Sequence, residues 1–265
     1  MTPLRARIKA PVRRIASSIR RRAATLVGSS VDLPAFGPAG PLSTFHDTRR
    51  AVAAAFLRGR GIEIGALHQP LIVPTDVNVT YVDRMTTAAL RGHYPELADV
   101  ALVDVDVVDD GERLTTFGDA TQDFVVANHF IEHCQNPLQT FHNLFRVLKP
   151  AGILFMAVPD KRFTFDVGRP CTPVDHIMRD FSDGPECSKR QHFEEWSRLV
   201  NKTAEADVAA QVEHLIAIDW SIHFHVWSGP ELVELMLAFQ RILAFELELF
   251  LRNGGESLCV LRKAS

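Results

Sequence analysis

Short apolar runs and segments of helical periodicity alternate along the middle of the chain. The runs that predict buried strands are Arg60–Ile64, Asn78–Val82, Val100–Val105, Asp123–Asn128 and Ile153–Val158. Helices are predicted at 48–57 and 137–148, because apolar positions recur there at helical spacing. The second helix has Pro137 in its first turn and stops before Pro150 and Gly152. Strands that alternate with helices are typical of a parallel sheet covered by helices.

The pattern changes after the fifth predicted strand. Residues 160–227 have little strand character, carry much charge and include all 3 tryptophans of the chain. An insertion at the carboxyl edge of a sheet is a place where an acceptor pocket can form, so we expect an acceptor-binding helical insertion here. A helix at 230–239 follows, and two strands at 245–251 and 257–261 are joined by a glycine turn.

Composition and charge narrow the class of protein. The chain has 265 residues and is 46% hydrophobic, which is enough for one substantial core. Residues 1–30 contain eight Lys or Arg and no acid, so with a net charge of -3 the rest of the chain is strongly acidic. An acidic body is a poor partner for nucleic acid. We expect residues 45–265 to form one domain.

Residues 1–44 are predicted to be a basic N-terminal helix and a linker. Apolar and basic residues share the 4–27 stretch at imperfect amphipathic spacing, and Pro11 interrupts it. Such a helix suits peripheral attachment to an anionic membrane or to a polyanionic or glycan partner, and a solvated extension gives the same pattern. The 4 cysteines lack CxxC spacing, and no apolar run predicts a signal peptide or a membrane span. We expect a cytoplasmic protein, with peripheral membrane association left open.

A candidate ligand site lies where the first two predicted strands end. Glu63 and Gly65 close the first strand and Asp83 closes the second, as in doubly wound sheets that present a ribose-binding carboxylate. A dinucleotide fingerprint needs three glycines beside the pyrophosphate, but Ala66 and Leu67 follow Gly65. Glu63 repels a diphosphate and suits a ligand with an ammonium or sulfonium charge. The turn therefore predicts a cationic nucleoside rather than NAD.

Together with these residues, three later segments resemble the class I S-adenosylmethionine-dependent methyltransferases of the type 11 kind. The segments are Asp110-Gly111-Glu112, Asn128-His129-Phe130-Ile131-Glu132-His133 and Leu148-Lys149-Pro150-Ala151-Gly152. The resemblance implies an α/β fold with a doubly wound, Rossmann-like seven-stranded sheet, a C-terminal antiparallel hairpin and a helical insertion after strand five.

The same resemblance implies that S-adenosylmethionine is the cofactor. Its binding residues would be Glu63, Gly65, Ala66, Asp83, Asp110, Gly111 and Asn128. Asp83 would bind the ribose hydroxyls, Asp110 the adenine edge and Asn128 the amino group. Other aspartates crowd around Asp110, which leaves the register at that position open.

Candidate catalytic residues follow the fourth predicted strand. If the segment begins a helical turn, His129 and His133 share one face at i, i+4 with Glu132 beside them. A histidine there can accept the proton of a hydroxyl group while Glu132 fixes its tautomer. A helix-capping, hydrogen-bonded histidine explains the same residues, so both interpretations stay open.

The insertion supplies candidate acceptor-binding residues. They are Asp160, Arg162, Phe163, Asp166, His192, Trp196 and His225. These segments resemble methyltransferases of sugar-modifying and polysaccharide gene sets, including sugar O-methyltransferases. Carboxylates and arginines beside flat aromatic rings suit a saccharide, which has apolar ring faces and hydroxyl edges. Core aromatics and surface charges give the same composition.

Metal dependence is left open by the sequence. Some sugar O-methyltransferases use Mg²⁺, which prefers oxygen ligands, so Asp160, Asp166 and Glu132 are the candidate ligands. His223 and His225 alternate, and on a strand both imidazoles would point the same way and could share a metal with Asp160 or another acid.

The sequence therefore predicts an S-adenosylmethionine-dependent O-methyltransferase that acts on a hydroxyl of a saccharide or glycosylated small molecule. One alternative is methylation of another small molecule at carbon or nitrogen. A second is a non-catalytic binding platform for glycan-modifying partners. A nicotinamide-dependent enzyme is disfavoured by the missing glycines.

Overall fold

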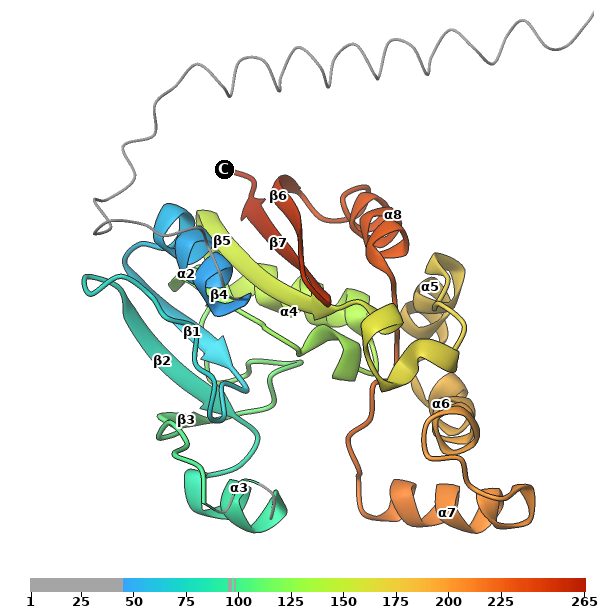
Figure 1. Ribbon diagram of the computed structural model, residues 1–265. Helices are drawn as coiled ribbons and strands as arrows, with labels where there is room; N and C mark the ends of the chain where they lie inside the picture. The colour runs from blue at the N-terminus through green and yellow to red at the C-terminus, as the bar shows by residue number, and fades with distance from the viewer. Residues whose placement is uncertain (1–44, 95–96, 98) are drawn as a thin grey trace, which may run out of the picture. The chain divides into compact units, whose positions relative to one another are not determined.

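The computed structural model describes residues 45–94, 97 and 99–265 (Figure 1). Its centre is a seven-stranded sheet with the strand order β3-β2-β1-β4-β5-β7-β6. The strands are β1 (Arg60–Ile64), β2 (Asn78–Asp83), β3 (Val107–Val108), β4 (Gln122–Val126), β5 (Leu148–Pro159), β6 (Phe245–Asn253) and β7 (Glu256–Lys263). The first five pair in parallel, and β7 is antiparallel to both β5 and β6. The predicted fold class, including the C-terminal hairpin, is confirmed.

Helices cover both faces of this sheet. Those of the core are α2 (Phe45–Phe56), α3 (Thr87–His93), α4 (Pro137–Val147) and α8 (Gly229–Phe239). Phe124 and Val126 of β4 pack with Ala53 of α2 in one apolar cluster. Val125 packs on the other face, in a second cluster that includes side chains of α4 and α8. Because the strand is buried on both faces, its apolar residues form a continuous run instead of alternating with polar ones.

The predicted position of strand three is wrong. Residues 100–105 form no strand, and β3 is Val107–Val108, which pairs with the end of β2. Hydrogen bonds to side chains hold the segment that precedes β3. The Val105 N–H donates to Thr87 Oγ1 (2.9 Å), and Asp106 Oδ2 accepts from the Tyr81 N–H (2.8 Å). Side chains therefore take up backbone groups that a strand ladder would use.

The insertion after β5 is helical, as predicted. Its helices are α5 (Val174–Asp183), α6 (Glu186–Leu199) and α7 (Glu205–Ala217). They lie beyond the end of β5 (Figure 1). A separate apolar cluster joins α6 and α7 to the segment that precedes α8, and its buried residues are Phe193, Val208, Val212, Leu215, Ile222 and Phe224. The insertion therefore has a small core of its own.

Two sequence predictions concern the N-terminal part of the chain and membranes. The predicted basic helix and linker at 1–44 lie outside the described residues. Within the part of the chain that the structure describes, no helix is both long and apolar enough to cross a bilayer.

Candidate functional site

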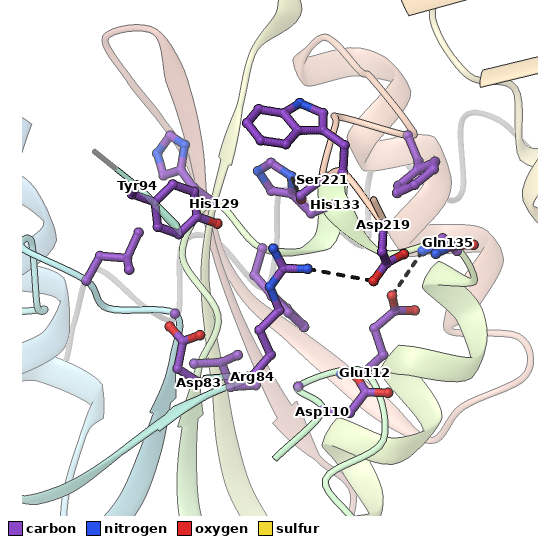
Figure 2. A pocket seen from close by; sticks show the side chains of 17 residues that line it. Asp83, Arg84, Tyr94, Asp110, Glu112, His129, His133, Gln135, Asp219 and Ser221 are labelled. Carbon is purple, nitrogen blue, oxygen red and sulfur yellow. Dashed lines mark hydrogen bonds and ion pairs between the residues drawn. The ribbon is translucent and has the colours of Figure 1, made fainter. Parts of the chain in front are cut away.

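A cavity of about 400 Å³ opens at the carboxyl ends of β1, β2 and β4 (Figure 2). This volume lies in the range of small-molecule sites, roughly 300–1,000 Å³. Lining residues that the sequence predicts are Gly65, Asp83, Asp110, Gly111, His129 and His133. The insertion also reaches the cavity, through Asp219, Trp220, Ser221 and Phe224. One cavity therefore joins the predicted nucleoside site to a wall from the insertion.

The turn after β1 is shaped by Glu63 and Gly65. Gly65 has a φ of 66°, a conformation that favours glycine, and a Cβ added there would meet no atom within 4 Å. Its backbone thus faces open space. Both carboxylate oxygens of the buried Glu63 accept from the Leu71 N–H, at 2.9 and 3.1 Å. Burial raises the pKa of Glu63 to about 7, while the Leu71 hydrogen bond and Arg49 oppose the rise. Glu63 therefore holds the turn and does not line the cavity, and the cofactor-binding role predicted for it stays a prediction.

Asp83 and Asp110 place carboxylates at the cavity wall. Burial raises the pKa of Asp83, against hydrogen bonds from the Arg84 and Met85 backbone. Asp110 lines the cavity, whereas the buried Asp109 turns away and bonds the hydroxyls of neighbouring threonines. Of these two aspartates only Asp110 lines the cavity, and the adenine-binding role predicted for it stays a prediction.

Gly111 is a point of close approach in the cavity wall. A Cβ there would lie 2.6 Å from Ile64 Cγ2 and 2.9 Å from Phe130 Cζ. Any other residue would push these apolar side chains apart. Glycine therefore keeps an apolar, closely packed surface beside Asp110, which suits a flat ring with a polar edge.

Ala66 and Asn128 do not line the cavity, although each adjoins a residue that does. Asn128 is nonetheless unusual. Its side-chain nitrogen and oxygen are both buried, and within the described chain neither has a hydrogen-bond partner. Unpaired buried amides are costly and call for an explanation such as a missing ligand. The roles predicted for Ala66 and Asn128 stay predictions.

The expectation that His129 and His133 share one face of a helical turn is wrong. His129 has a φ of 49°, and the short 3₁₀ helix begins only at Ile131. The left-handed conformation reverses the chain before the turn starts. His129 Nδ1 is 3.7 Å from Glu132 Oε1, too far for a hydrogen bond.

His129 is held by a buried ion pair and not by Glu132. Arg49 of α2 and Glu256 of β7 pair directly, with Arg49 Nε donating to Glu256 Oε1 over 2.9 Å. His129 Nε2 lies 2.9 Å from Glu256 Oε2 and 2.8 Å from Arg49 Nη2. Burial tends to raise the pKa of Glu256, but hydrogen bonds from Arg49 and His129 outweigh it and lower the pKa. An ionised carboxylate therefore faces the imidazole.

His133 contacts the insertion. Its Nδ1 is 3.0 Å from the Ile222 carbonyl oxygen and 3.1 Å from Ser221 Oγ, so Nδ1 carries the proton and donates to the carbonyl. Burial and the neighbouring His223 lower the pKa of His133 to about 3, so the ring is neutral near pH 7. Glu132 is fully buried, and burial raises its pKa.

The predicted acceptor residues lie outside the lining of the cavity. Asp160 is paired with Arg162 through Arg162 Nε and Asp160 Oδ1 at 2.9 Å. Phe163 is exposed and lies under the Arg252 guanidinium, 4.9 Å from ring centre to Cζ. Trp196 packs against the small core of the insertion. Their acceptor-binding roles stay predictions.

The remaining three predicted acceptor residues are buried in polar clusters. Asp166 Oδ1 accepts from Arg169 Nη1 at 2.9 Å, and Asp166 Oδ2 lies 2.6 Å from His223 Nδ1. His192 and His225 are buried together in a different cluster. Polar side chains of the insertion thus hold its own segments together.

The expectation that His223 and His225 share a metal site is wrong. Residues 221–225 form no strand, so the period-two argument does not apply. His223 lies with Glu132 and His133, while His225 lies with other histidines. Of the candidate Mg²⁺ ligands, Asp166 and Glu132 approach His223, and Asp160 does not belong to that group. Magnesium dependence stays a prediction.

Sequence reasoning missed two features of the site. Arg84 extends from beside Asp83 toward Asp219, forming an ion pair of 3.9 Å across the cavity (Figure 2). Trp220 lines the cavity and approaches His93 of α3, with ring centres 6.0 Å apart. The concentration of tryptophans in the insertion was the only signal for Trp220, and Arg84 is marked only by its place after Asp83.

A comparison with protein families matches the part of the chain that contains the strand ends at this cavity. Residues 59–156, a little over a third of the chain, match a family model described as a methyltransferase domain of type 11. The match runs from β1 into β5. It includes the core wall of the cavity, which consists of the lining residues between Ile64 and Gln135, whereas the insertion wall consists of those between Asp219 and Phe224. No curated protein matches the chain.

Solved structures with similar chain traces are distant in sequence. The carbon methyltransferase CurJ is 14% identical, with a TM-score of 0.46 over 84% of this chain, and the chain spans 54% of that protein's length. A Pyrococcus horikoshii protein is 18% identical, with a TM-score of 0.44 and coverage of 79% and 83% of the two chains. A S-adenosylmethionine-dependent methyltransferase of Thermotoga maritima is 16% identical, with a TM-score of 0.43 and coverage of 94% and 97%.

Proposed function

We propose that this chain, which carries a class I S-adenosylmethionine-dependent methyltransferase domain, transfers a methyl group to a hydroxyl oxygen of a saccharide or glycosylated small molecule. The observation that carries the proposal is the composition of one cavity. The strand-end carboxylate Asp83 lies on its core wall, the imidazoles of His129 and His133 lie beside it, and the indole of Trp220 lies on the insertion wall.

The cavity suits a cationic nucleoside. Among the described residues of its lining are four carboxylates and a single guanidinium, from Asp83, Asp110, Glu112, Asp219 and Arg84. This balance attracts a sulfonium and repels a diphosphate. Gly111 keeps an apolar surface next to Asp110, and the unpaired Asn128 amide is a ready partner for an amino or carboxylate group. The residues present therefore fit S-adenosylmethionine, the cofactor of this class of domain.

Residues of the chain then have to orient the acceptor and take its proton. When bound, S-adenosylmethionine supplies a methyl group that is electrophilic because it is attached to a sulfonium sulfur. His129 is the better placed base, because it lines the cavity and 43% of its side chain is exposed. Glu256 would stabilise the imidazolium that forms as His129 accepts the hydroxyl proton. His133 has a pKa of about 3 and is too weak a base near neutral pH.

The insertion wall supports a saccharide acceptor. Trp220 offers an aromatic face, and Asp219 and Ser221 on either side of it offer hydrogen-bonding oxygens. An apolar face flanked by such oxygens matches a pyranose ring with its hydroxyl edges. Seating the ring against this wall would place a hydroxyl group toward the histidines, with water excluded by the ring.

Transfer of labelled methyl groups tests the proposal. The full chain is incubated with labelled S-adenosylmethionine and a panel of monosaccharides and glycosides, with and without Mg²⁺, and the products are examined for methyl ethers. A labelled sugar ether supports the proposal. Label on carbon or nitrogen of a non-sugar acceptor contradicts the acceptor class, and cofactor binding without turnover across a broad acceptor panel favours the binding platform.

A substitution in the insertion wall sharpens this test. Trp220→Ala should raise the KM for the saccharide by about tenfold, since aromatic contacts contribute about 0.5–1.5 kcal/mol beyond area burial. Its cofactor affinity should stay within twofold of wild type. Phe181→Ala is the matched control, because Phe181 is an exposed aromatic residue of the insertion outside the cavity lining. An unchanged KM in Trp220→Ala would contradict the proposed acceptor wall.

A further inference from the structure

The insertion contains a group of four metal-ligating side chains that the proposed reaction does not use. This histidine cluster consists of His176, Asp180, His192 and His225. The first two belong to α5, the third to α6, and the fourth to the segment between α7 and α8. None of the four lines the cavity. We propose that the histidine cluster binds one divalent transition-metal ion, preferably Zn²⁺, as a structural site.

The distances within the histidine cluster match a tetrahedral ion. One donor atom from each residue can be chosen so that all four lie within 4.8 Å of one another. His176 Nε2 is 3.0 Å from His192 Nε2 and 3.3 Å from Asp180 Oδ2, and His225 Nε2 is 3.7 Å from Asp180 Oδ2. Ligands about 2.0–2.1 Å from a tetrahedral Zn²⁺ are about 3.3 Å apart. The observed separations bracket this value.

The histidine cluster leaves buried polar atoms without partners. His225 is fully buried, and within the described chain neither of its ring nitrogens has a hydrogen-bond partner of good geometry, since the Gln135 backbone makes only a weak contact with the ring. Asp180 is 1% exposed, and its Oδ2 also lacks one. Leaving such groups unpaired is costly, so a bare histidine cluster is a poor way to fill this space. A single cation would satisfy these orphaned atoms together with the two other imidazoles.

Neighbouring groups already orient the ligands. Ser188 Oγ donates to Asp180 Oδ1 over 2.6 Å, which leaves Oδ2 directed at the histidines. The His225 ring stacks on Trp227, with ring centres 5.9 Å apart and an interplanar angle of 28°. Such second contacts fix ligand orientation in metal sites.

The donor set identifies the class of metal. Three imidazoles and one carboxylate suit Zn²⁺ and related first-row ions, whereas Mg²⁺ and Ca²⁺ require oxygen ligands. Four protein ligands also close a tetrahedral site, which is the pattern of structural rather than catalytic zinc. The ion would tie α5 and α6 to the segment containing Phe224, which lines the cavity. Metal binding therefore supports the insertion wall without entering the reaction.

Metal analysis of the full chain tests the proposal. After removal of metal with a chelator and dialysis, Zn²⁺ titration should give about one tightly bound equivalent and raise the melting temperature. Co²⁺ in its place should give the intense visible bands of a tetrahedral site with nitrogen and oxygen ligands. Stoichiometry below about a tenth of an equivalent, or octahedral Co²⁺ bands, would overturn the proposal.

Variants locate the ion. Asp180→Asn and His192→Ala should each weaken Zn²⁺ binding by at least about tenfold. His214→Ala on the exposed surface of α7 is the matched control and should bind as wild type. His223→Ala tests the second histidine group, beside the cavity, and should also retain the ion. Loss of binding in His223→Ala with retention in Asp180→Asn and His192→Ala would contradict the assignment. The isosteric Asp180→Asn keeps the test valid if His192→Ala fails to fold.

Discussion

The core wall and the insertion wall of the cavity are held by different kinds of interaction. On the core side, main-chain pairing continues past β1, with the Gly65 N–H donating to the Val82 carbonyl at 2.9 Å, and the Glu63 carboxylate adds one side-chain contact to the Leu71 N–H. On the insertion side, the buried Arg169 guanidinium holds the backbone, donating to the carbonyls of His223 (2.7 Å) and Phe224 (3.1 Å). The core wall should therefore tolerate side-chain changes that would disorganise the insertion wall.

Substitution of the proposed catalytic base, His129, gives the largest expected effect. His129 belongs to the core wall but is held by the Arg49–Glu256 pair. His129→Ala should lower kcat by about 10²- to 10⁴-fold, because the acceptor proton loses its base. Cofactor affinity should change little. Steady-state kinetics with calorimetry checks both, and a kcat within threefold of wild type would argue against a hydroxyl acceptor.

Removing the buried guanidinium tests the insertion wall. Arg169→Met should destabilise the insertion by about 3–5 kcal/mol, because it removes the guanidinium that pairs with the buried Asp166 and leaves that carboxylate with His223 as its remaining cationic partner. Hydrogen exchange should accelerate in 221–226 and remain slow in β1. Arg198→Met, which removes an exposed guanidinium of α6, is the control and should have no measurable effect. Equal loss of protection in both walls would contradict the proposal that different interactions hold them.

A fall in pH should destabilise the contact between His133 and the insertion wall and stabilise the turn after β1 in the core wall. The pKa of His133 is lowered from 6.5 to about 3 by burial, so protonation favours the unfolded state and the contact with Ile222 weakens as pH falls below 6.5. The pKa of Glu63 is raised from 4.5 to about 7 by burial, so protonation favours the folded turn as pH falls from 7 toward 4.5. Hydrogen exchange at pH 7 and pH 5, corrected for intrinsic rates, measures both slopes. His133→Asn should remove the first slope only.

The ion pair across the cavity gives the smallest expected effect. Arg84 and Asp219 are 3.9 Å apart and partly or largely exposed, so the pair should contribute less than about 1 kcal/mol. Arg84→Ala should leave the melting temperature nearly unchanged, as should Asp219→Ala. A large loss in either variant would mean that exposed charges, rather than the Arg169 contacts, hold the insertion wall.

The difference between main-chain and side-chain contacts also explains which parts of the structure could be predicted from the sequence. β1, β2 and β4 are buried parallel strands whose apolar runs are local signals, and strand ends place Gly65 and Asp83 without further information. β3 was misplaced because it lies at the sheet edge, where side-chain hydrogen bonds replace part of the ladder.

Contacts between distant residues could not be predicted. Arg49 and Glu256 are separated by 207 positions, and no local pattern indicates that they meet at His129. In the insertion, Trp220 reaches the cavity and Trp196 does not, although both are large aromatics in charged surroundings. Tertiary packing of α6 and α7 decides between them, and a single sequence carries no record of that packing.

Calorimetric titration of the full chain with S-adenosylmethionine and with NAD tests the central claim most directly. The cavity should bind S-adenosylmethionine at one site and fail to bind NAD, and Asp83→Ala should weaken binding by about tenfold to a hundredfold through loss of charge-assisted hydrogen bonds. Asp104→Ala, which removes an exposed carboxylate outside the cavity lining, should bind as wild type. Binding of NAD, or S-adenosylmethionine affinity unchanged in Asp83→Ala, would contradict the account.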